Sequence, residues 1–379
     1  MKKTLYILTL SILATACRKP YDPPVVQTDH RFLVVEGLIN TGSDSTIIKL
    51  SRTVNIKSAS TIRPELGATV TVESDQNNNY PLNDAANGNY VSAGINADPK
   101  QKYRLRIHTT DGNTYLSDFC EAKITQPIDS IETTIKTNGV DIRLDTHDPT
   151  NTSRYYRWKY EENYRFHAYF DSYFMAAGYR VIFRPADKDI YGCFAADTSS
   201  TIILNSTAKL AQDVVYQTPI TFVPSTSEKL ETTYSIHVTQ YALTADAYNY
   251  YTQLQKNTQQ LGSIFDAQPS QLASNIHCIN NPSIPVIGYI TAGTYSERRI
   301  YIQNHDLPAW VPVTFYDSYQ YYGCGYFVQN VSTPEQFQFW NQGNPPFYTP
   351  TIDTVTWAPT ICVDCRLRGS LTPPPFWPK

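Results

Sequence analysis

The stretch KYRLRIHTTDGNTYLS, residues 102–117, indicates the fold class of the N-terminal part of the chain. Tyr103, Leu105 and Ile107 alternate with basic residues. Because successive side chains of a strand point to opposite faces, this alternation predicts a half-buried strand. The Asp-Gly pair at 111–112 predicts a tight turn into a second strand. The stretch is therefore expected to form a β-hairpin.

The segments before this hairpin carry similar signals. FLVVEGLI at 32–39 is a near-continuous apolar run, as in a buried strand. In GATVTVES, Val70 and Val72 alternate with polar residues, and the segment at 74–90 is rich in Asn and Asp, a turn composition. Several short strands at this spacing predict an immunoglobulin-like β-sandwich over residues 32–124.

Residues 125–379 are expected to form a larger β-rich domain. RYYRWKYEENYRFHAYF at 154–170 predicts a long strand or a hairpin, in which Trp158 faces the core and Arg157, Lys159 and Glu161 face the other way. Three further segments are predicted to be strands: 235–243, 285–292 and 299–304. The whole chain is thus predicted to be mainly β.

One segment of the larger domain has a helical period. Thr244 is placed to cap its N-terminus, and Gly262 is placed to end it. The residues between them that fall on one apolar stripe are Ala247, Tyr248, Tyr251, Leu254 and Leu261. We expect one helix packed on a sheet.

The composition excludes several classes of protein. The 379 residues include 31 Lys and Arg and 34 Asp and Glu, which gives a net charge of −3, and 13% are aromatic. This aromatic content argues against a disordered chain. A slightly acidic chain lacks the concentrated basic face of a nucleic-acid binder, so no nucleic-acid partner is expected.

The N-terminus MKKTLYILTLSILATAC predicts export. Two lysines, a short apolar run and small residues before Cys17 are typical of a signal peptide at residues 1–16. A Cys directly after small residues is the arrangement of a bacterial lipoprotein signal, so we expect Cys17 to be acylated and to hold the protein in the outer membrane lipid, on its surface or its periplasmic face. The alternative is an ordinary signal cut near Ala16, which leaves Cys17 as a plain thiol.

Residues 17–31 predict an extended tether. Pro20, Pro23 and Pro24 oppose helix and favour polyproline II. The residues after Cys17 would span about 45 Å in that conformation.

The other six cysteines are Cys120, Cys193, Cys278, Cys324, Cys362 and Cys365. In an exported chain an even number predicts up to three disulfides, with the connectivity open. The CxxC pair at 362–365 has no second pair for a zinc site and precedes a Pro-rich tail rather than a helix. We therefore favour disulfides over free thiols, metal or redox chemistry.

Two aromatic segments, 317–327 and 337–348, contain Gly, Pro or Asn and are expected to be surface loops. Loops often carry binding residues, and exposed Tyr and Trp contribute strongly to interfaces. The candidate residues for contacting a ligand or partner are Tyr319, Tyr321, Tyr322, Trp340 and Phe347.

No catalytic motif is found, and no enzyme activity, cofactor or metal is predicted. Glu161 and Glu162 would lie on opposite faces of a strand, and we expect a turn there that exposes both. His277 and Cys278 are likewise placed to point apart. The remaining acidic residues are Asp187, Asp189 and Asp197. We interpret them as part of a solvated loop rather than as a calcium site.

Several phrases of the chain resemble a known family. They are LVVEGLI, GATVTV, NGNY, YRLRI, STAKL (206–210), QYALTADAYNYY (240–251), LGSIFDAQPSQL (261–272), NIHC (275–278), NPSIPVIGYITA (281–292), CVDCRLRG (362–369) and FW (376–377). Together they resemble the Bacteroidota lipoproteins grouped as domain of unknown function 4249. The resemblance implies an outer-membrane lipoprotein, often encoded beside a TonB-dependent transporter, and it supplies no reaction.

The expected function is that of an accessory protein that partners a TonB-dependent transporter and helps to capture its substrate. A lipid anchor would confine both proteins to one membrane, so a weak interface between them would suffice. The alternative is a surface glycan-binding or adhesion lipoprotein that works alone. A hydrolase is a third, less favoured reading, because some glycosidases present only two distant carboxylates.

Overall fold

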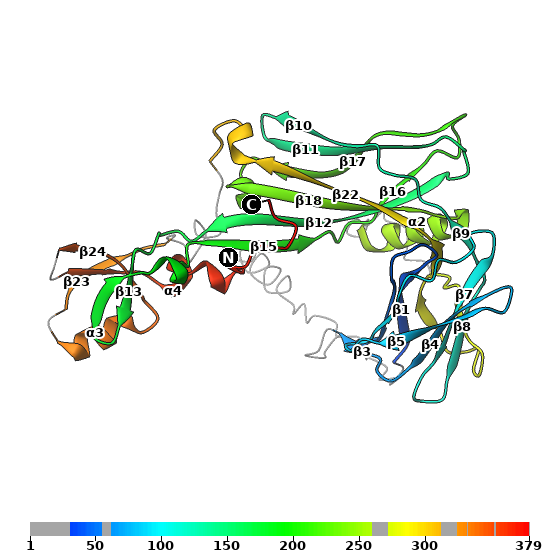
Figure 1. Cartoon of the computed structure of the whole chain (residues 1–379), viewed down its shortest axis with the longest axis horizontal. Helices are drawn as coiled ribbons and strands as arrows, with labels where there is room; N and C mark the ends of the chain where they lie inside the picture. Colours follow the sequence, from blue (N-terminus) through cyan, green and yellow to red (C-terminus); the bar gives the residue numbers. More distant parts are fainter. Residues whose placement is uncertain are drawn as a thin grey trace, which may run out of the picture.

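The computed structural model describes residues 31–54, 62–259, 272–311, 324–331, 333–351 and 354–378. It is mainly β, with one long helix, α2 (Ala245–Gln259), among the described residues. Both features confirm the prediction. Three regions are visible in Figure 1: a closed sheet at the lower right, a two-layer sandwich above it, and a smaller C-terminal lobe at the left. None of the helices in the described ranges combines the length and the apolar character needed to cross a membrane.

The closed sheet contains twelve strands from the described ranges. Eight of them form a ring in the order β7-β4-β5-β6-β2-β1-β21-β9, because β9 also pairs with β7. The strands are β1 (Leu33–Asn40), β2 (Thr46–Arg52), β3 (Arg63–Pro64), β4 (Thr69–Ser74), β5 (Asn79–Asp84), β6 (Asn89–Ser92), β7 (Lys102–His108), β8 (Thr114–Ser117), β9 (Cys120–Lys123), β19 (Ile276–Cys278), β20 (Val286–Gly288) and β21 (Thr291–Gly293).

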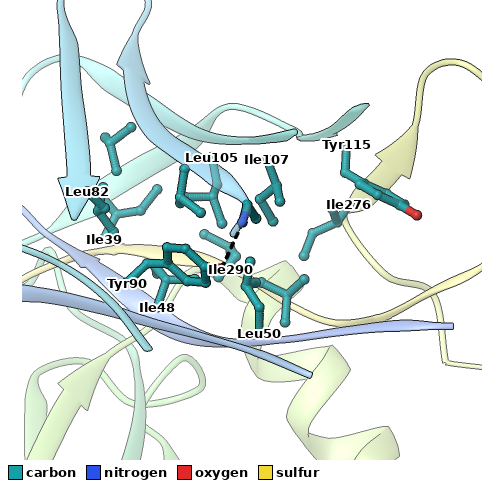
Figure 2. Packing of buried hydrophobic residues seen from close by; sticks show 14 of the residues in the cluster. Ile39, Ile48, Leu50, Leu82, Tyr90, Leu105, Ile107, Tyr115, Ile276 and Ile290 are labelled. Atoms are coloured by element: carbon teal, nitrogen blue, oxygen red, sulfur yellow. Dashed lines mark hydrogen bonds between the residues drawn. The ribbon is translucent and has the colours of Figure 1, made fainter. Parts of the chain in front are cut away.

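The ring closes because the two ends of β7 pair with different strands. Tyr103, near its start, lies opposite Cys120 of β9, whereas Arg106, near its end, lies opposite Leu116 of β8. The predicted immunoglobulin-like arrangement has two separate sheets, and here the strands are joined into one. Figure 2 shows side chains from opposite walls, among them Ile48 and Ile107, pointing into one interior.

Strands far along the chain complete this sheet. Strands β20 and β21 run parallel to β1, with Val34 opposite Ile287 and Ile39 opposite Ala292. The predicted strand at 285–292 therefore lies in the first sheet and not in the larger domain. Gly288 permits the close approach, since its φ is +127° and a Cβ there would lie 2.0 Å from the carbonyl oxygen of Val35.

The sandwich packs a three-stranded sheet, β10-β11-β17, against a sheet with the order β15-β12-β18-β22 and with β16 beside β12. Its core includes Trp158, Tyr156 and Tyr234, each fully buried, so the predicted core position of Trp158 is confirmed. The strands are β10 (Ser130–Lys136), β11 (Gly139–Asp148), β12 (Tyr155–His167), β15 (Gly192–Thr198), β16 (Ile203–Ser206), β17 (Asp213–Pro224), β18 (Thr233–Ala242) and β22 (Tyr295–Gln303).

Helix α2 begins as predicted. The side-chain oxygen of Thr244 accepts a hydrogen bond from the N–H of Ala247 at 3.2 Å, which caps the helix. Ala247 is buried, and Tyr248, Tyr251 and Leu254 are half-buried. The predicted last turn, with Leu261 and Gly262, lies outside the described residues.

The C-terminal lobe combines a hairpin, a three-stranded sheet and short helices. Its elements are β13 (Phe174–Ala177), β14 (Arg180–Phe183), β23 (Phe327–Asn330), α3 (Pro334–Asn341), β24 (Pro346–Thr351), β25 (Thr354–Trp357) and α4 (Thr360–Val363). The 3-10 turns in the described part of the chain are η1 (Ala186–Lys188), η2 (Glu228–Leu230), η3 (Asn304–Asp306) and η5 (Cys365–Leu367).

Candidate functional site

A cavity of about 600 Å³ lies between the closed sheet and the sandwich. Its floor is the outer face of the sandwich sheet, formed by β12, β18 and β22, and its other walls come from β1, β2, β20, β21 and α2. This volume falls within the usual range for small-molecule sites, which also favour the junctions between domains. We call it the inter-sheet cavity.

Strand register arranges the polar side chains of the floor in rows. On each strand the residues two apart share a face, so alternate residues of β12 point into the cavity. Antiparallel pairing then sets their neighbours on β18 and β22. One row is Arg157, Tyr241 and Tyr295, and the next is Lys159, Thr239 and Glu297.

Arg157 lies against aromatic rings. Its guanidinium carbon is 4.1 Å from the centroid of the Tyr251 ring and 5.6 Å from that of Tyr241. Both distances are within the range of cation–π attraction. Within the described ranges no carboxylate lies within 4.0 Å of this guanidinium, so its charge is not neutralised by an ion pair.

Lys159 also lacks an ion-pair partner in the described part of the chain. Its ammonium is open to the water of the cavity but is surrounded by protein, and this burial, followed by repulsion from Arg157, lowers its pKa from 10.5 to about 8. Glu36 and Glu161 act in the opposite direction, without reversing the shift. A Lys with this lowered pKa is a cation that an incoming negative charge would stabilise.

The cavity also contains carboxylates. Glu36 projects from β1, and Glu161 from β12, and both are exposed to it. Glu297 already has partners, since its carboxylate accepts a hydrogen bond from the Thr239 hydroxyl at 3.2 Å and lies 3.6 Å from His237. The site therefore presents both signs of charge.

The remaining walls are aromatic and aliphatic. The rings of Tyr250 and Tyr289 lie 4.8 Å apart, and burial raises the pKa of each hydroxyl to about 12, so both stay neutral hydrogen-bonding groups. Aliphatic residues around them include Leu38, Ile47 and Ile287, of which Ile47 is 54% exposed. Tyrosines with apolar bodies and polar tips are suited to holding ring-containing or amphipathic ligands.

The residues that line the cavity come from positions 34 to 297. Residues 18–299 match the family described as Domain of unknown function (DUF4249). The chain belongs to this family. The DUF4249 region thus contains every residue of the cavity lining, whereas most of the C-terminal lobe lies beyond it.

No curated protein matches this DUF4249 chain. Among solved structures, it is similar to a two fibronectin type-III domain segment from chicken tenascin, at 8% identity and a TM-score of 0.16. That match covers 55% of this chain and 90% of the tenascin segment. A TM-score this low says nothing about the fold of the DUF4249 chain, which is defined by its own strand pairing.

The predicted loop aromatics do not form the cavity. Tyr319, Tyr321 and Tyr322 lie outside the described residues, and Trp340 lies in α3, where its side chain is not described. Phe347 is buried, at 9% exposure, and its ring stacks on that of Phe170 with centroids 4.5 Å apart. The prediction that Phe347 is a surface contact was wrong, because α4 and neighbouring residues cover its ring. Contacts between segments far apart in the chain cannot be predicted from the residues next to Phe347.

The cysteines of this DUF4249 chain form two of the three predicted bridges within the described residues. They are Cys193–Cys365 and Cys324–Cys362, so each cysteine of the CxxC pair bonds to a distant partner. Cys17 lies outside the described residues.

A third bridge, between Cys120 and Cys278, is not formed, and both are free thiols. The amide of Asn275 donates to the sulfur of Cys120 at 3.5 Å, and Asn275 is three positions before Cys278. Three residues of extended chain span about 10 Å, which exceeds the reach of a disulfide.

The two adjacent glutamates lie on opposite faces of β12. The predicted turn between them was wrong, since β12 runs without interruption through Glu161 and Glu162. Glu162 is 6% exposed; it accepts a hydrogen bond from the Tyr234 hydroxyl at 2.7 Å and one from the Lys229 ammonium at 2.6 Å. Glu162 thus belongs to the packed interior of the sandwich, whereas Glu161 lines the cavity.

The remaining polar candidates are dispersed. His277 is exposed while Cys278 is buried, as expected for neighbours on a strand. Asp187 lies in η1, Asp189 accepts a hydrogen bond from the N–H of Tyr191, and Asp197 pairs with Lys229 at 2.8 Å. Across the described ranges, no group of three or more His, Cys, Asp or Glu side chains is placed to hold a metal ion.

The sequence pattern identified the outward face of β12 but not that this face lines a cavity. Arg157, Lys159 and Glu161 were assigned to one face, where charged residues usually meet water. The available signal was that two cations precede the carboxylate in a segment with many tyrosines. What covers this face, β1 and α2, is decided by tertiary packing.

Proposed function

We propose that this chain is an outer-membrane lipoprotein that captures a small ligand in the inter-sheet cavity and partners a TonB-dependent transporter. The observation that carries the proposal is the pair Arg157 and Lys159, two cations in a tyrosine-lined cavity with no ion-pair partner among the described residues. Charges held partly out of water without a partner are costly. A bound ligand that supplies the missing partner would offset that cost.

The anchor is argued from the sequence of the N-terminus. Small residues precede Cys17, and a Pro-containing tether follows it before the first described strand. Confinement at the membrane would raise the effective concentration of the protein near a transporter, so that a weak contact could suffice. No catalytic role is part of this proposal.

The anchor is tested by mass spectrometry of the mature protein isolated from its membrane. We expect an N-terminal Cys17 that carries acyl chains, and a Cys17→Ser variant that is released from the membrane fraction. A bare Cys17 in the native protein would contradict the anchor.

The partnership is tested by purifying the tagged full chain from native membranes in a mild detergent. Co-purification of a TonB-dependent transporter is the expected result, and it should be absent from a preparation of an unrelated tagged lipoprotein. A preparation that contains no transporter after chemical cross-linking in intact cells would overturn the partnership.

A glycan-binding or adhesion protein that works alone is the second candidate. It is favoured by the rings of Tyr250, Tyr289 and Tyr295 in the cavity, because aromatic rings present apolar faces together with hydroxyl groups. Saturable binding on a glycan array, lost in Tyr289→Ala and observed without any transporter, would support it. Absence of binding across the array would dismiss it.

A further inference from the structure

We infer that the ligand of the inter-sheet cavity is a short peptide with free amino and carboxyl ends. The inference rests on the proposed capture function and narrows it to one chemical class. Its basis is the combination, around one cavity of about 600 Å³, of an apolar wall with two cations and two carboxylates that have no ion-pair partner among the described residues.

The carboxyl end is assigned to Arg157 and Lys159. These residues are two apart on β12 and therefore project from the same face of the sheet. Charge-assisted hydrogen bonds from a guanidinium and an ammonium are stronger than neutral ones, and the gain is larger where protein limits access of water. The pKa of Lys159 is lowered by the surrounding protein and then by Arg157, in keeping with an ammonium that lies inside the cavity beside a second cation.

The amino end is assigned to Glu36 and Glu161. Both line the cavity, and both act on Lys159 electrostatically, so they lie near the cations without forming an ion pair with them. A ligand ammonium would neutralise one or both carboxylates. Glu297 is less available, because Thr239 and His237 already contact it.

The side chains of a peptide would meet the aliphatic wall. Ile47 and Ile287 are 54% and 42% exposed, although both are large apolar residues. They come from β2 and β20, on the side of the cavity that belongs to the closed sheet. Covering them with an apolar side chain would remove apolar surface from water, which is favourable in proportion to the area covered.

Charge balance separates this ligand from the other classes. A neutral sugar would leave the charges of Arg157, Lys159, Glu36 and Glu161 without partners. A purely anionic ligand would meet the cations but would also face three carboxylates, those of Glu36, Glu161 and Glu297. A zwitterion with an apolar body satisfies both signs of charge and the aliphatic wall at once.

The inference is tested by calorimetric titration of the full chain, solubilised in mild detergent, with the tripeptide Ala-Leu-Ala. The same tripeptide is titrated with its amino end acetylated and with its carboxyl end amidated. We expect the uncapped peptide to bind, and each cap to weaken binding by about tenfold or more, which corresponds to the loss of one charge-assisted hydrogen bond.

Variants assign the two ends. Lys159→Met should weaken binding of the uncapped peptide but leave the affinity of the amidated peptide unchanged, and Glu36→Gln should do the same for the acetylated peptide. Lys209→Met is the matched control, because Lys209 is exposed and does not line the cavity. Circular dichroism checks that each variant is folded.

The outcomes separate the inference from the function on which it rests. Equal affinity for capped and uncapped peptides overturns the peptide assignment. Binding of maltotriose in place of the peptide, weakened by Tyr289→Ala, also overturns it but leaves ligand capture standing. Tripeptide binding together with no transporter in the native preparation would support the ligand and overturn the partnership alone.

Discussion

Thr125 and Thr294 are joined by two hydrogen bonds at the point where the chain passes between the closed sheet and the sandwich. The N–H of Thr125 donates to the side-chain oxygen of Thr294 at 2.9 Å, and the Thr125 hydroxyl donates to the carbonyl oxygen of Thr294 at 2.6 Å. Thr125 follows β9, and Thr294 lies between β21 and β22. These bonds tie together the segment that follows β9 and the segment that joins β21 to β22.

The first prediction concerns this junction. The oxygen of the buried Thr125 side chain also accepts a hydrogen bond from the N–H of Ala242 at 2.9 Å. Thr125→Val would leave that N–H and the Thr294 carbonyl without this partner, so we expect the free energy of unfolding to fall by about 2 kcal/mol. Urea unfolding measures the change. Thr134→Val, on the exposed strand β10, is the control and should change stability by less than about 0.5 kcal/mol.

The second prediction concerns pH. Burial opposes ionisation of Asp148, but hydrogen bonds from Thr150, Ser153 and Thr152 outweigh it and hold the pKa of its carboxyl well below the usual 3.8. Because the folded state lowers this pKa, the carboxylate stabilises the protein fully above pH 3.8 and loses that effect as the pH falls through the folded value.

Asp148→Asn should therefore lower the free energy of unfolding near neutral pH by about 1–3 kcal/mol. It should also make stability fall less steeply between about pH 4 and about pH 2. Urea unfolding across this pH range is the measurement. Parallel curves for the parent and the variant below pH 4 would contradict the assignment.

The third prediction concerns the disulfides. Cys193–Cys365 connects residues 172 positions apart, so it restricts the unfolded chain strongly. Replacing both cysteines by Ala should lower the free energy of unfolding by about 3 kcal/mol. Peptide mapping without reductant should recover Cys193–Cys365 and Cys324–Cys362. A bridge within the CxxC pair would refute this pairing.

The reactivity of the two free cysteines, Cys120 and Cys278, gives an independent test of the cysteine pairing. Burial raises the pKa of Cys120 to about 12, so little reactive thiolate is present at neutral pH. Cys120 and Cys278 should react with iodoacetamide only after unfolding. Rapid labelling of Cys120 in the folded protein would show that its thiol is accessible to solvent, and would contradict the burial described for it.

The fourth prediction concerns the amine of Lys159. Its pKa near 8 means that about half of the group is the neutral, acylatable amine at pH 8. Competitive acetylation across a pH series, read by mass spectrometry, should give Lys159 a midpoint near pH 8 and a higher rate than the exposed Lys209. A bound peptide should slow the reaction at Lys159 alone. The same rate at both lysines would contradict the environment described for the cavity.

Local pattern accounts for much of the fold. The alternation in residues 102–117 gave strands β7 and β8 joined by a turn, Thr244 capped α2, and Trp158 entered the core. These features depend on neighbours within a few residues, where backbone geometry and side-chain spacing decide the outcome. Glu161 and Glu162 of β12 show where local pattern fails to predict the structure, because the sequence EEN is compatible with either a turn or a strand.

The sequence by itself determined that this chain is mainly β with one capped helix, and it placed the charged face of β12 opposite its core face. Tertiary structure alone decided that 286–293 adds to β1, that β9 closes the sheet on β7, and which cysteines pair. The reason is physical. Each of these features needs two strand edges or side chains from distant parts of the chain to meet, and the local periodicity of one segment does not specify its partner. The inter-sheet cavity belongs to this second group, since it exists only where β1 and α2 come to lie over the outer face of the sandwich.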